Sequence, residues 1–372
     1  MSTLSLVIPC FNEERTLARC VGRVLRIADA QLSLEVIIVD DGSTDQSLAL
    51  ARQLQSDHPE VTVIAHEWNR GKGAALRTGF ARATGDFVVV QDADLEYDPS
   101  DLKRLVSPLQ RDEADVVLGS RFLSTGTHRV LYFWHAIGNR ALTLLSNMLT
   151  DLNLTDMECG YKMFRRDILQ RLQLEETRFG FEPEIIAKIA QLRLRIFEMG
   201  VSYRGRTYAE GKKIGLKDGV RALYCILRYN APHAPVPMQF ALYLFVGGLA
   251  ALLNVGMFLG LWRAGWPVSA AAPAAFAAAA ALNYALCVLL LFRHNARWHS
   301  PAELTLFLAV VAAVGWVDWA STQRLMDQGV SAAAAKWAAT GLGLILNFVG
   351  RRFIVFPEPP AGPWKPQEPT GS

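Results

Sequence analysis

The sequence predicts an α/β fold with a mostly parallel sheet, followed by an all-helical region that spans a membrane. Short runs rich in Val and Ile alternate with helix-patterned segments before residue 235, as in open sheets wrapped by helices. Charged residues recur every few positions there, whereas Arg263 is the only Lys, Arg, Asp or Glu between Met238 and Phe292. We therefore expect an α/β domain over residues 1–230, a transmembrane domain over 231–356 and a Pro-rich, disordered tail over 357–372.

The apolar runs of the first domain are expected to form buried parallel strands, because they are short and bounded by turn or polar residues. They are Leu4 to Ile8, Leu34 to Val39, Val61 to Ala65, Phe87 to Val90 and Val116 to Gly119. The expected helices are Glu13 to Ile27, Asp45 to Gln55 and Lys72 to Ala83. For the segment from His128 to Leu149, a helix at the membrane surface and a packed helix flanking the sheet both remain open.

Four apolar stretches in the second half approach the roughly 20 residues that span hydrocarbon. They are Met238 to Leu261, Ala270 to Phe292, Leu304 to Trp319 and Ala332 to Val349. Basic residues mark the cytoplasmic side, together with the first domain, and are Arg293, Arg297, Arg351 and Arg352. An aromatic belt is expected opposite, at Trp262, Trp266, Trp316 and Trp319. Since the apolar run from Leu4 has no basic leader and is too short for a signal sequence, the first domain is expected to stay in the cytoplasm. With four spans and this orientation, we expect a multi-pass inner-membrane protein with both termini in the cytoplasm.

Composition excludes several other classes. The formal net charge of +3 and the lack of an aromatic-spaced basic stripe argue against nucleic acid as a partner. Five cysteines without CxxC spacing indicate neither a disulfide framework nor a zinc site, and fit a reducing cytosol.

Polar residues follow the first two predicted strands. The segment from Ile8 to Glu14 could hold a base or ribose, although Asn12 and Glu13 could instead cap the next helix, and no GxGxxG is present. Asp40 and Asp41 close the second strand. Because adjacent carboxylates are costly without a ligand or cation, Asp40 is expected to contact a nucleotide.

Two further motifs suggest phosphate and metal binding. The small residues from Asn69 to Ala75 open a helix whose free N–H groups could receive a diphosphate, although tight helix packing would produce the same residues. Asp92 and Asp94 follow the fourth strand, where alternation would place both on one face and suit Mg²⁺ or Mn²⁺. Two solvated acids in a loop are the alternative.

These motifs, CFNEE, DDGSTD, NRGKGAA and DADLE, resemble in order and spacing the family 2 glycosyltransferases of GT-A fold. Within that family they resemble the dolichyl- or polyprenyl-phosphate hexose synthases. Three later segments narrow the resemblance: Gly119 to Arg121, Asp156 to Lys162 and Arg206 to Lys212. The last is similar to an Arg-x-x-Gly-Glu-Ser-Lys segment of these synthases, from which it departs at Ala209 and Gly211.

The resemblance implies a role for each matching residue. The nucleotide would be surrounded by Pro9, Phe11, Glu13 and Asp40. The metal would be held by Asp92, Asp94 and Glu96, the last of which is often Gln in the family. Phosphates of acceptor or donor would be met by Arg121, Arg140, Arg206 and Lys212. Asp156 would lie near the reacting sugar, so that Asp94, Asp156 and Arg121 form the catalytic set, and Glu184 matches a further acid of the family.

The implied reaction is inverting transfer of glucose or mannose, from UDP-glucose or GDP-mannose, to polyprenyl phosphate. A phosphate monoester is already anionic near neutral pH, so the acceptor needs cations rather than a base. Two alternatives remain open: transfer to a hydroxyl acceptor, and a lipid transporter or flippase whose soluble domain only binds a nucleotide sugar. A processive synthase is disfavoured, because the nearest string to Gln-x-x-Arg-Trp, His294 to Trp298, lies between predicted spans. An oligomer is also left open.

The second half resembles the four-helix GtrA-like family. The resemblance rests on Phe245 to Gly248, a central Asn254, and the ending from Asn347 to Phe356. The polar residues Asn254, Asn283 and Asn347 would make interhelical hydrogen bonds or line a path for a lipid head group. Lys212, Lys213, Lys217 and Arg221, just before the first span, form either a solvated basic face or a docking site for membrane lipids with anionic headgroups.

Overall fold

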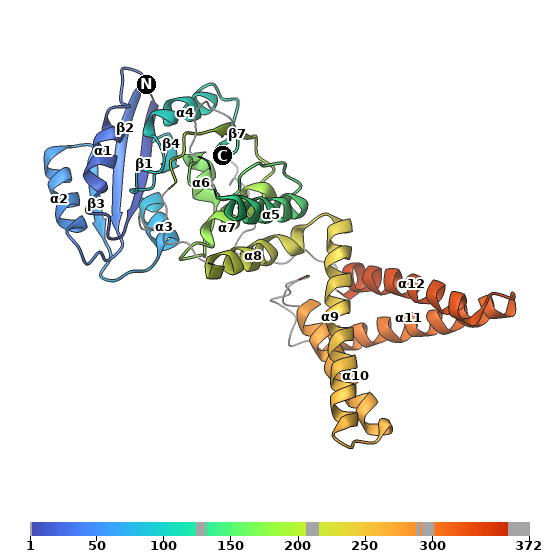
Figure 1. The fold of residues 1–372 in the computed structure, drawn as a ribbon. Helices are drawn as coiled ribbons and strands as arrows, with labels where there is room; N and C mark the ends of the chain where they lie inside the picture. The colour runs from blue at the N-terminus through green and yellow to red at the C-terminus, as the bar shows by residue number, and fades with distance from the viewer. Residues whose placement is uncertain are drawn as a thin grey trace. The chain divides into compact units, whose positions relative to one another are not determined.

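The computed structural model describes residues 2–123, 130, 132–205, 216–287, 291 and 301–355. The described chain divides into two compact units, with the boundary between Asn230 and Ala231 (Figure 1). The predicted tail and the segment from Arg206 to Lys212 lie outside the described residues, as does the string from His294 to Trp298.

The first unit is built on a seven-stranded sheet in the order β3-β2-β1-β4-β6-β5-β7. Its strands are β1 (Ser2–Cys10), β2 (Leu32–Asp40), β3 (Val61–Ala65), β4 (Phe87–Val90), β5 (Val116–Ser120), β6 (Lys162–Arg165) and β7 (Ile196–Gly200). Only β6 among them runs antiparallel to its neighbours, β4 and β5. The prediction of a mostly parallel α/β sheet is therefore confirmed, and all five predicted strands are present.

Helices cover both faces of this sheet. They are α1 (Leu17–Leu25), α2 (Ser47–Asp57), α3 (Lys72–Arg82), α4 (Leu102–Gln110), α5 (Phe133–Thr150), α6 (Arg166–Arg171), α7 (Phe181–Gln191) and α8 (Leu216–Asn230). On one face Leu4, Leu6 and Ile8 of β1 join a core with buried residues of α1 and α4. On the other, α3 approaches so closely that a Cβ at Gly79 would lie 2.2 Å from Cγ1 of Val7. Because successive side chains of a strand point to opposite faces of the sheet, β1 contributes to the packing on both faces.

The first helix begins later than its pattern predicts. It was expected from Glu13, but α1 starts at Leu17 because the chain makes a left-handed turn at Asn12, whose φ is 54°. The polar residues after β1 are thereby held in a loop.

Helix α5 has features both of a packed helix that flanks the sheet and of a helix at the membrane surface. Its polar residues Asn139, Thr143 and Ser146 are buried against the rest of the first unit. Its apolar residues Phe133 and Trp134 are 66% and 80% exposed. The helix therefore packs through polar side chains and presents an apolar face outward.

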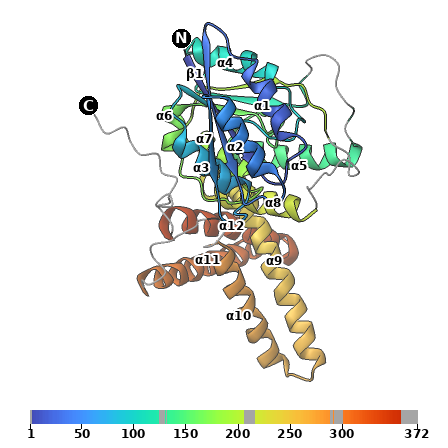
Figure 2. The same cartoon turned by 90° about the vertical axis from the view of Figure 1, so that its left-hand side faces the viewer.

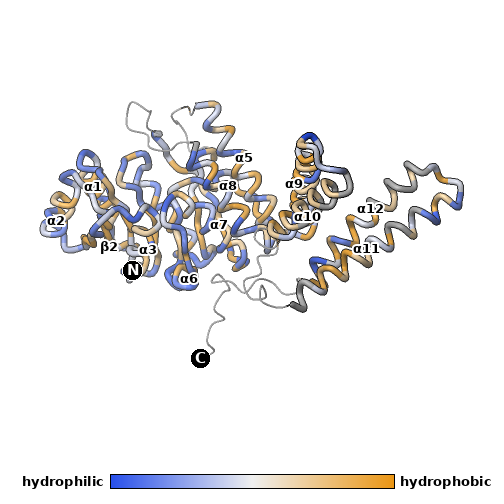
Figure 3. Tube along the Cα trace, turned by 90° about the horizontal axis from the view of Figure 1, so that it is seen from below, coloured by the Kyte–Doolittle hydropathy of each residue, from blue (hydrophilic) through white to orange (hydrophobic). Residues whose placement is uncertain are grey.

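The second unit consists of two antiparallel helix pairs, α9 with α10 and α11 with α12 (Figure 2). The helices are α9 (Val236–Arg263), α10 (Val268–Leu286), α11 (Pro301–Asp327) and α12 (Ala332–Gly350), and a π-helical stretch, Arg351–Val355, follows α12. Hydrophobic residues recur along α9 and α10 (Figure 3). Among the described residues, only α9 is by itself long and apolar enough to cross a membrane. An all-helical second domain is thus confirmed, whereas four spans remain a proposal.

Candidate active site

The predicted site residues lie where strands of the first unit end. In register, Cys10 at the end of β1 lies beside Asp40 at the end of β2. Strand β4, which leads to Asp92, runs parallel to β1 on its other side. Parallel strands bring their carboxyl ends to one edge of the sheet, where ligands of such folds bind.

The two aspartates after β2 have different roles. Asp41 accepts hydrogen bonds from the backbone N–H of Arg70 at 2.9 Å and of Gly71 at 2.7 Å, so it organises the loop before α3. Asp40 is 1% exposed, and its Oδ2 accepts a bond from the N–H of Ser43 at 3.1 Å. Its Oδ1 is buried without a partner among the described residues. An unpaired buried acceptor fits a ligand that brings its own donor.

Residues after β1 are joined to the loop after β2, while the Glu13 carbonyl also accepts from the N–H of Leu17 at the start of α1, at 2.9 Å. Asn12 Oδ1 accepts a bond from the N–H of Thr44 at 2.8 Å. The N–H of Glu13 donates to Ser47 Oγ, also at 2.8 Å. Because Thr16 occupies the N-cap position of α1, the capping alternative for Asn12 is wrong. The partly exposed Pro9 and Phe11 lie on the same segment.

The start of α3 is packed against protein, as the packing alternative for these residues expects. The N–H of Ala74 donates to the carbonyl of Thr177 at 3.1 Å. A Cβ at Gly71 would lie 2.3 Å from the Thr177 carbonyl oxygen, and one at Gly73 would lie 2.3 Å from that of Glu176. The small residues therefore permit a close backbone approach, which is the packing alternative.

The acidic residues after β4 lie in a turn, so strand alternation does not position them. Oδ1 of Asp94 accepts a bond from the N–H of Glu96 at 3.1 Å. Oε2 of Glu96 accepts one from the Tyr203 hydroxyl at 2.8 Å. The turn is closely packed as well, since a Cβ at Gly160 would lie 2.6 Å from Oδ2 of Asp92.

Lys72 supplies a cation to this turn, which sequence reasoning missed. Its Nζ lies 2.9 Å from Oδ1 of Asp92 and 3.1 Å from Oε1 of Glu182, in the first turn of α7. Although burial opposes it, the two carboxylates hold the pKa of the ammonium group above its ordinary value. Only its place within the motif NRGKGAA could have drawn attention to this lysine.

Glu182, the second partner of Lys72, also acts on another buried acid, Glu158. Oε1 of Glu158 and Oε2 of Glu182 are buried and have no hydrogen-bond partner among the described residues. Burial, reinforced by the Glu182 carboxylate, raises the pKa of Glu158 to about 7. This region can thus hold a proton near neutral pH.

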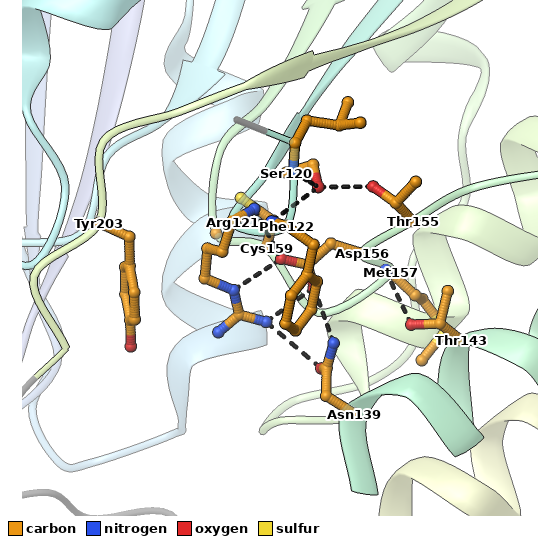
Figure 4. Close-up of polar contacts among 12 residues, drawn as sticks. Ser120, Arg121, Phe122, Asn139, Thr143, Thr155, Asp156, Met157, Cys159 and Tyr203 are labelled. Carbon is orange, nitrogen blue, oxygen red and sulfur yellow. Dashed lines mark hydrogen bonds and ion pairs between the residues drawn. The ribbon is translucent and has the colours of Figure 1, made fainter. Parts of the chain in front are cut away.

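Arg121 and Asp156 form a buried two-point ion pair (Figure 4). Nε of Arg121 donates to Oδ2 of Asp156 and Nη2 donates to Oδ1, both at 2.7 Å. The Asn139 amide of α5 donates to the same Oδ1 at 3.0 Å. Burial favours the neutral acid, but the guanidinium outweighs it and lowers the pKa of Asp156. In this structure the Asp156 carboxylate therefore accepts hydrogen bonds from Arg121 and Asn139 and holds both side chains in place.

Aromatic rings connect the acidic turn to this ion pair. The ring of Tyr203 faces the Arg121 guanidinium, with Cζ 5.2 Å from the ring centroid (Figure 4). The same tyrosine donates to Glu96, and its ring packs on Tyr97 at 5.1 Å between centroids. Tyr203 therefore contacts both a candidate metal ligand, Glu96, and a candidate phosphate ligand, Arg121.

The remaining predicted residues divide into three groups. Arg140, one residue after Asn139, is exposed, and its Cζ lies 5.4 Å from the Phe122 ring centroid. Glu184 is fully buried, and its two oxygens accept from the N–H groups of Glu175 and Glu176, so it stabilises a loop. Arg206 and Lys212 lie outside the described residues.

The carboxylates partly fit a divalent metal. Oxygen ligands are those that Mg²⁺ and Mn²⁺ prefer. Lys72 already neutralises Asp92, however, and no group of three or more His, Cys, Asp or Glu side chains is arranged for a metal in the described part of the chain. Asp94 and Glu96 are the better placed candidates, with a substrate diphosphate supplying further oxygens.

Comparisons with known proteins match both halves of the chain. The model for glycosyl transferase family 2 matches residues 5–173, and that for the GtrA/DPMS transmembrane domain matches residues 242–356. A dodecaprenyl-phosphate galacturonate synthase from Rhizobium johnstonii is 31% identical, over 67% of this chain and 74% of its own length. An undecaprenyl-phosphate mannosyltransferase from Micrococcus luteus is also 31% identical, over 56% and 86% respectively.

Two further similarities are more distant. A dolichol-phosphate mannosyltransferase from Pyrococcus furiosus is 26% identical, over 61% of this chain and 64% of its own length. Among solved structures, glucosyl-3-phosphoglycerate synthase from Mycobacterium tuberculosis aligns with a TM-score of 0.48 and 23% identity, over 62% of this chain and 80% of that one.

Proposed function

Because the chain belongs to glycosyl transferase family 2 and carries a GtrA/DPMS transmembrane domain, we propose that it transfers a sugar from a nucleotide sugar to a polyprenyl phosphate. The named acceptors of its relatives are dodecaprenyl, undecaprenyl and dolichol phosphates, which share one chemistry. Their sugars differ between mannose and galacturonate. We propose UDP-glucose or GDP-mannose as the donor here.

The observation that carries the proposal is the arrangement of Glu96, Tyr203 and Arg121, in which Tyr203 contacts both of the other residues. It places a carboxylate that could meet a metal next to a guanidinium that could meet a phosphate. In the proposed reaction, an oxygen of the lipid phosphate forms a bond to the anomeric carbon. The bond from that carbon to the nucleoside diphosphate breaks, the diphosphate leaves with the electron pair, and the configuration inverts.

The donor side of the site would be held by Pro9, Phe11, Glu13 and Asp40, with the unpaired Oδ1 of Asp40 accepting from the nucleoside. Asp94 and Glu96, with Asp92 beside them, would hold Mg²⁺ or Mn²⁺. When bound, such an ion neutralises charge on the diphosphate. Lys72 holds the Asp92 carboxylate in place and, because it also pairs with Glu182, offsets one of the two negative charges.

The acceptor side would be held by Arg121, Arg140, Arg206 and Lys212. Arg121 is oriented by Asp156, which accepts from Nε and Nη2, and by Asn139, whose Oδ1 accepts from Nη2 at 3.3 Å. Nη1 is the terminal nitrogen that would meet a phosphate. Asp156 is thus a positioning residue in this proposal. No base is needed for the acceptor, because a phosphate monoester is anionic near neutral pH.

The transmembrane-domain match makes the chain a membrane protein. We propose four spans in the inner membrane, with the catalytic unit and both termini in the cytoplasm. The exposed apolar face of α5, which includes Phe133 and Trp134, supports the interpretation of this helix as one that lies on a membrane surface.

Transfer to a hydroxyl is the second candidate, and Glu158 is the observation that favours it. A carboxyl group with a pKa near 7 could accept a proton from an alcohol. The lipid-phosphate reaction has no need of such a group.

One experiment separates the two acceptors. The purified full chain, with Mn²⁺ or Mg²⁺, would receive radiolabelled nucleotide sugars of glucose, mannose and galacturonate together with undecaprenyl phosphate. The matched control is undecaprenol, which has the same chain and a hydroxyl in place of the phosphate. Labelled glycolipid from the phosphate alone supports the proposal. Labelled product from the alcohol, or none from either with any donor, refutes it.

A further inference from the structure

A buried arginine in the second unit lacks an acidic partner. Arg351, at the end of α12, is 6% exposed. Its Nε donates to Oδ1 of Asn347 at 3.2 Å, and its Nη1 donates to Oδ1 of Asn283 on α10 at 2.5 Å. Nη1 also lies 3.5 Å from the sulfur of Cys287. Within the described residues no carboxylate reaches this guanidinium.

Aromatic rings complete the surroundings of this charge. The Cζ atom of Arg351 lies 4.6 Å from the centroid of Phe307 on α11 and 5.5 Å from that of Tyr243 on α9. All four helices thus contribute to one cluster, the Arg351 cluster, formed by Arg351, Asn283, Asn347, Tyr243 and Phe307. Its members are neutral except for the arginine.

The charge balance of the Arg351 cluster points to an anion. A guanidinium stays protonated in proteins, and amide oxygens and rings stabilise it without cancelling its charge. Removing a cation from water without an opposite charge is strongly unfavourable. Nη2, the other terminal nitrogen, makes no hydrogen bond to another described residue, so the fork that binds phosphate oxygens is not saturated.

The position of the cluster indicates which anion. Asn283 lies near the end of α10, Phe307 near the start of α11 and Asn347 near the end of α12. Because α9 with α10 and α11 with α12 are antiparallel pairs, the cluster members of each pair lie near the same end of that pair. Tyr243 is seven residues into α9, or roughly 10 Å at 1.5 Å per residue. Such a depth in a spanning helix corresponds to the region where lipid phosphates meet hydrocarbon. Ionisable residues placed there commonly mark ligand sites.

We propose that the Arg351 cluster binds the phosphate group of an anionic lipid, with the guanidinium pairing with phosphate oxygens beside Asn283 and Asn347. The cluster belongs to the second unit and the sugar-transfer residues belong to the first, and the proposal does not rest on the proposed transfer. Ordinary anionic phospholipids and prenyl phosphates offer the same headgroup chemistry.

Photolabelling of the full chain in phosphatidylcholine nanodiscs tests this proposal. The probe is a prenyl phosphate with a diazirine close to the phosphate, and labelled peptides are identified by mass spectrometry. We expect label on the peptides that contain Asn283 and Asn347. Arg351→Gln should reduce that label by about tenfold or more, as the loss of a charge-assisted contact would. The control Arg263→Gln removes the same charge from an exposed position at the far end of α9 and should leave the label unchanged.

Competition on the unaltered protein keeps the proposal falsifiable if Arg351→Gln does not fold. Excess undecaprenyl phosphate, phosphatidylglycerol or inorganic phosphate should displace the label, and their relative potency identifies the source of the phosphate. The prenol of equal length should not displace it. Equal displacement by the prenol, or undiminished label in folded Arg351→Gln, overturns the proposal. Asp94→Asn should keep the label even when transfer is lost, so this site and the transfer reaction can fail separately.

Discussion

The ammonium group of Lys72 lies 2.9 Å from Oδ1 of Asp92, so the protein itself supplies a cation to the acidic turn of the candidate site. The lysine comes from the first turn of α3, which is packed against the loop at Thr177. Since Lys72 also reaches Glu182, one side chain holds two acidic segments together.

Replacing Lys72 by Met should destabilise the protein by about 3 kcal/mol, because two largely buried carboxylates lose their partner. Thermal unfolding of the purified protein would measure this loss. Lys103→Met is the matched control, since it removes a pair with Asp29 in which both side chains are 45% exposed. Such surface pairs contribute between about 0 and 1 kcal/mol. Equal effects of the two substitutions would contradict the role given to Lys72.

Asp94→Asn should abolish sugar transfer while the protein stays folded and membrane-bound, because the substitution removes a charge that a cation requires. Transfer is measured as labelled glycolipid, and Mn²⁺ binding by electron paramagnetic resonance provides a readout that is independent of turnover. Near-normal transfer by this variant would show that the metal assignment is wrong.

Arg121 and Arg140 should respond differently to replacement by Ala. Arg121→Ala leaves Asp156, which is 2% exposed, without its partner, and should cost roughly 3 to 5 kcal/mol of stability as well as acceptor use. Arg140→Ala alters an exposed side chain and should weaken acceptor use at unchanged stability. Melting temperatures and the KM for undecaprenyl phosphate would distinguish the two effects. An Arg121→Ala variant as stable as the parent would refute the structural role of the pair.

Stability should fall as pH rises through the range set by Glu158. Its pKa is raised from 4.5 to about 7, so the folded state binds this proton more tightly than the unfolded state does. The stabilisation is fully present below pH 4.5 and is lost as the pH approaches 7. Glu158→Gln should flatten the decline in melting temperature between about pH 5 and pH 8. An unchanged slope in that variant would mean that other groups cause the decline.

Gly79→Ala should cost about 1 to 3 kcal/mol, because its new Cβ would lie 2.2 Å from Cγ1 of Val7 across the contact between helix and sheet. Gly22→Ala, on α1, is the control, since nothing lies within 4 Å of its Cβ. It should be neutral or stabilising by up to about 1 kcal/mol. Denaturation curves of both variants would decide; a tolerated alanine at position 79 would contradict the close approach.

The strands and most helices could be predicted because their signals are local. Val61–Ala65 and Phe87–Val90 were predicted with their observed bounds, since buried strands are continuous apolar runs. The start of α1 could not be predicted from local signals, because the turn at Asn12 depends on a hydrogen bond with Thr44 of another loop. Strand alternation also failed at Asp94, since β4 ends before it.

The sequence alone determined the two-part organisation, the family, and the acidic and basic residues from which the site is made. Hydrophobic periodicity and the order of motifs are local properties of the sequence, so they can be recognised without knowledge of distant contacts. Only the tertiary structure decided the partners: Lys72 with Glu182, Arg121 with Asp156, and Arg351 with Asn283. Each pair joins residues far apart in the chain, and which side chains meet depends on how whole helices and loops pack, which local patterns do not specify.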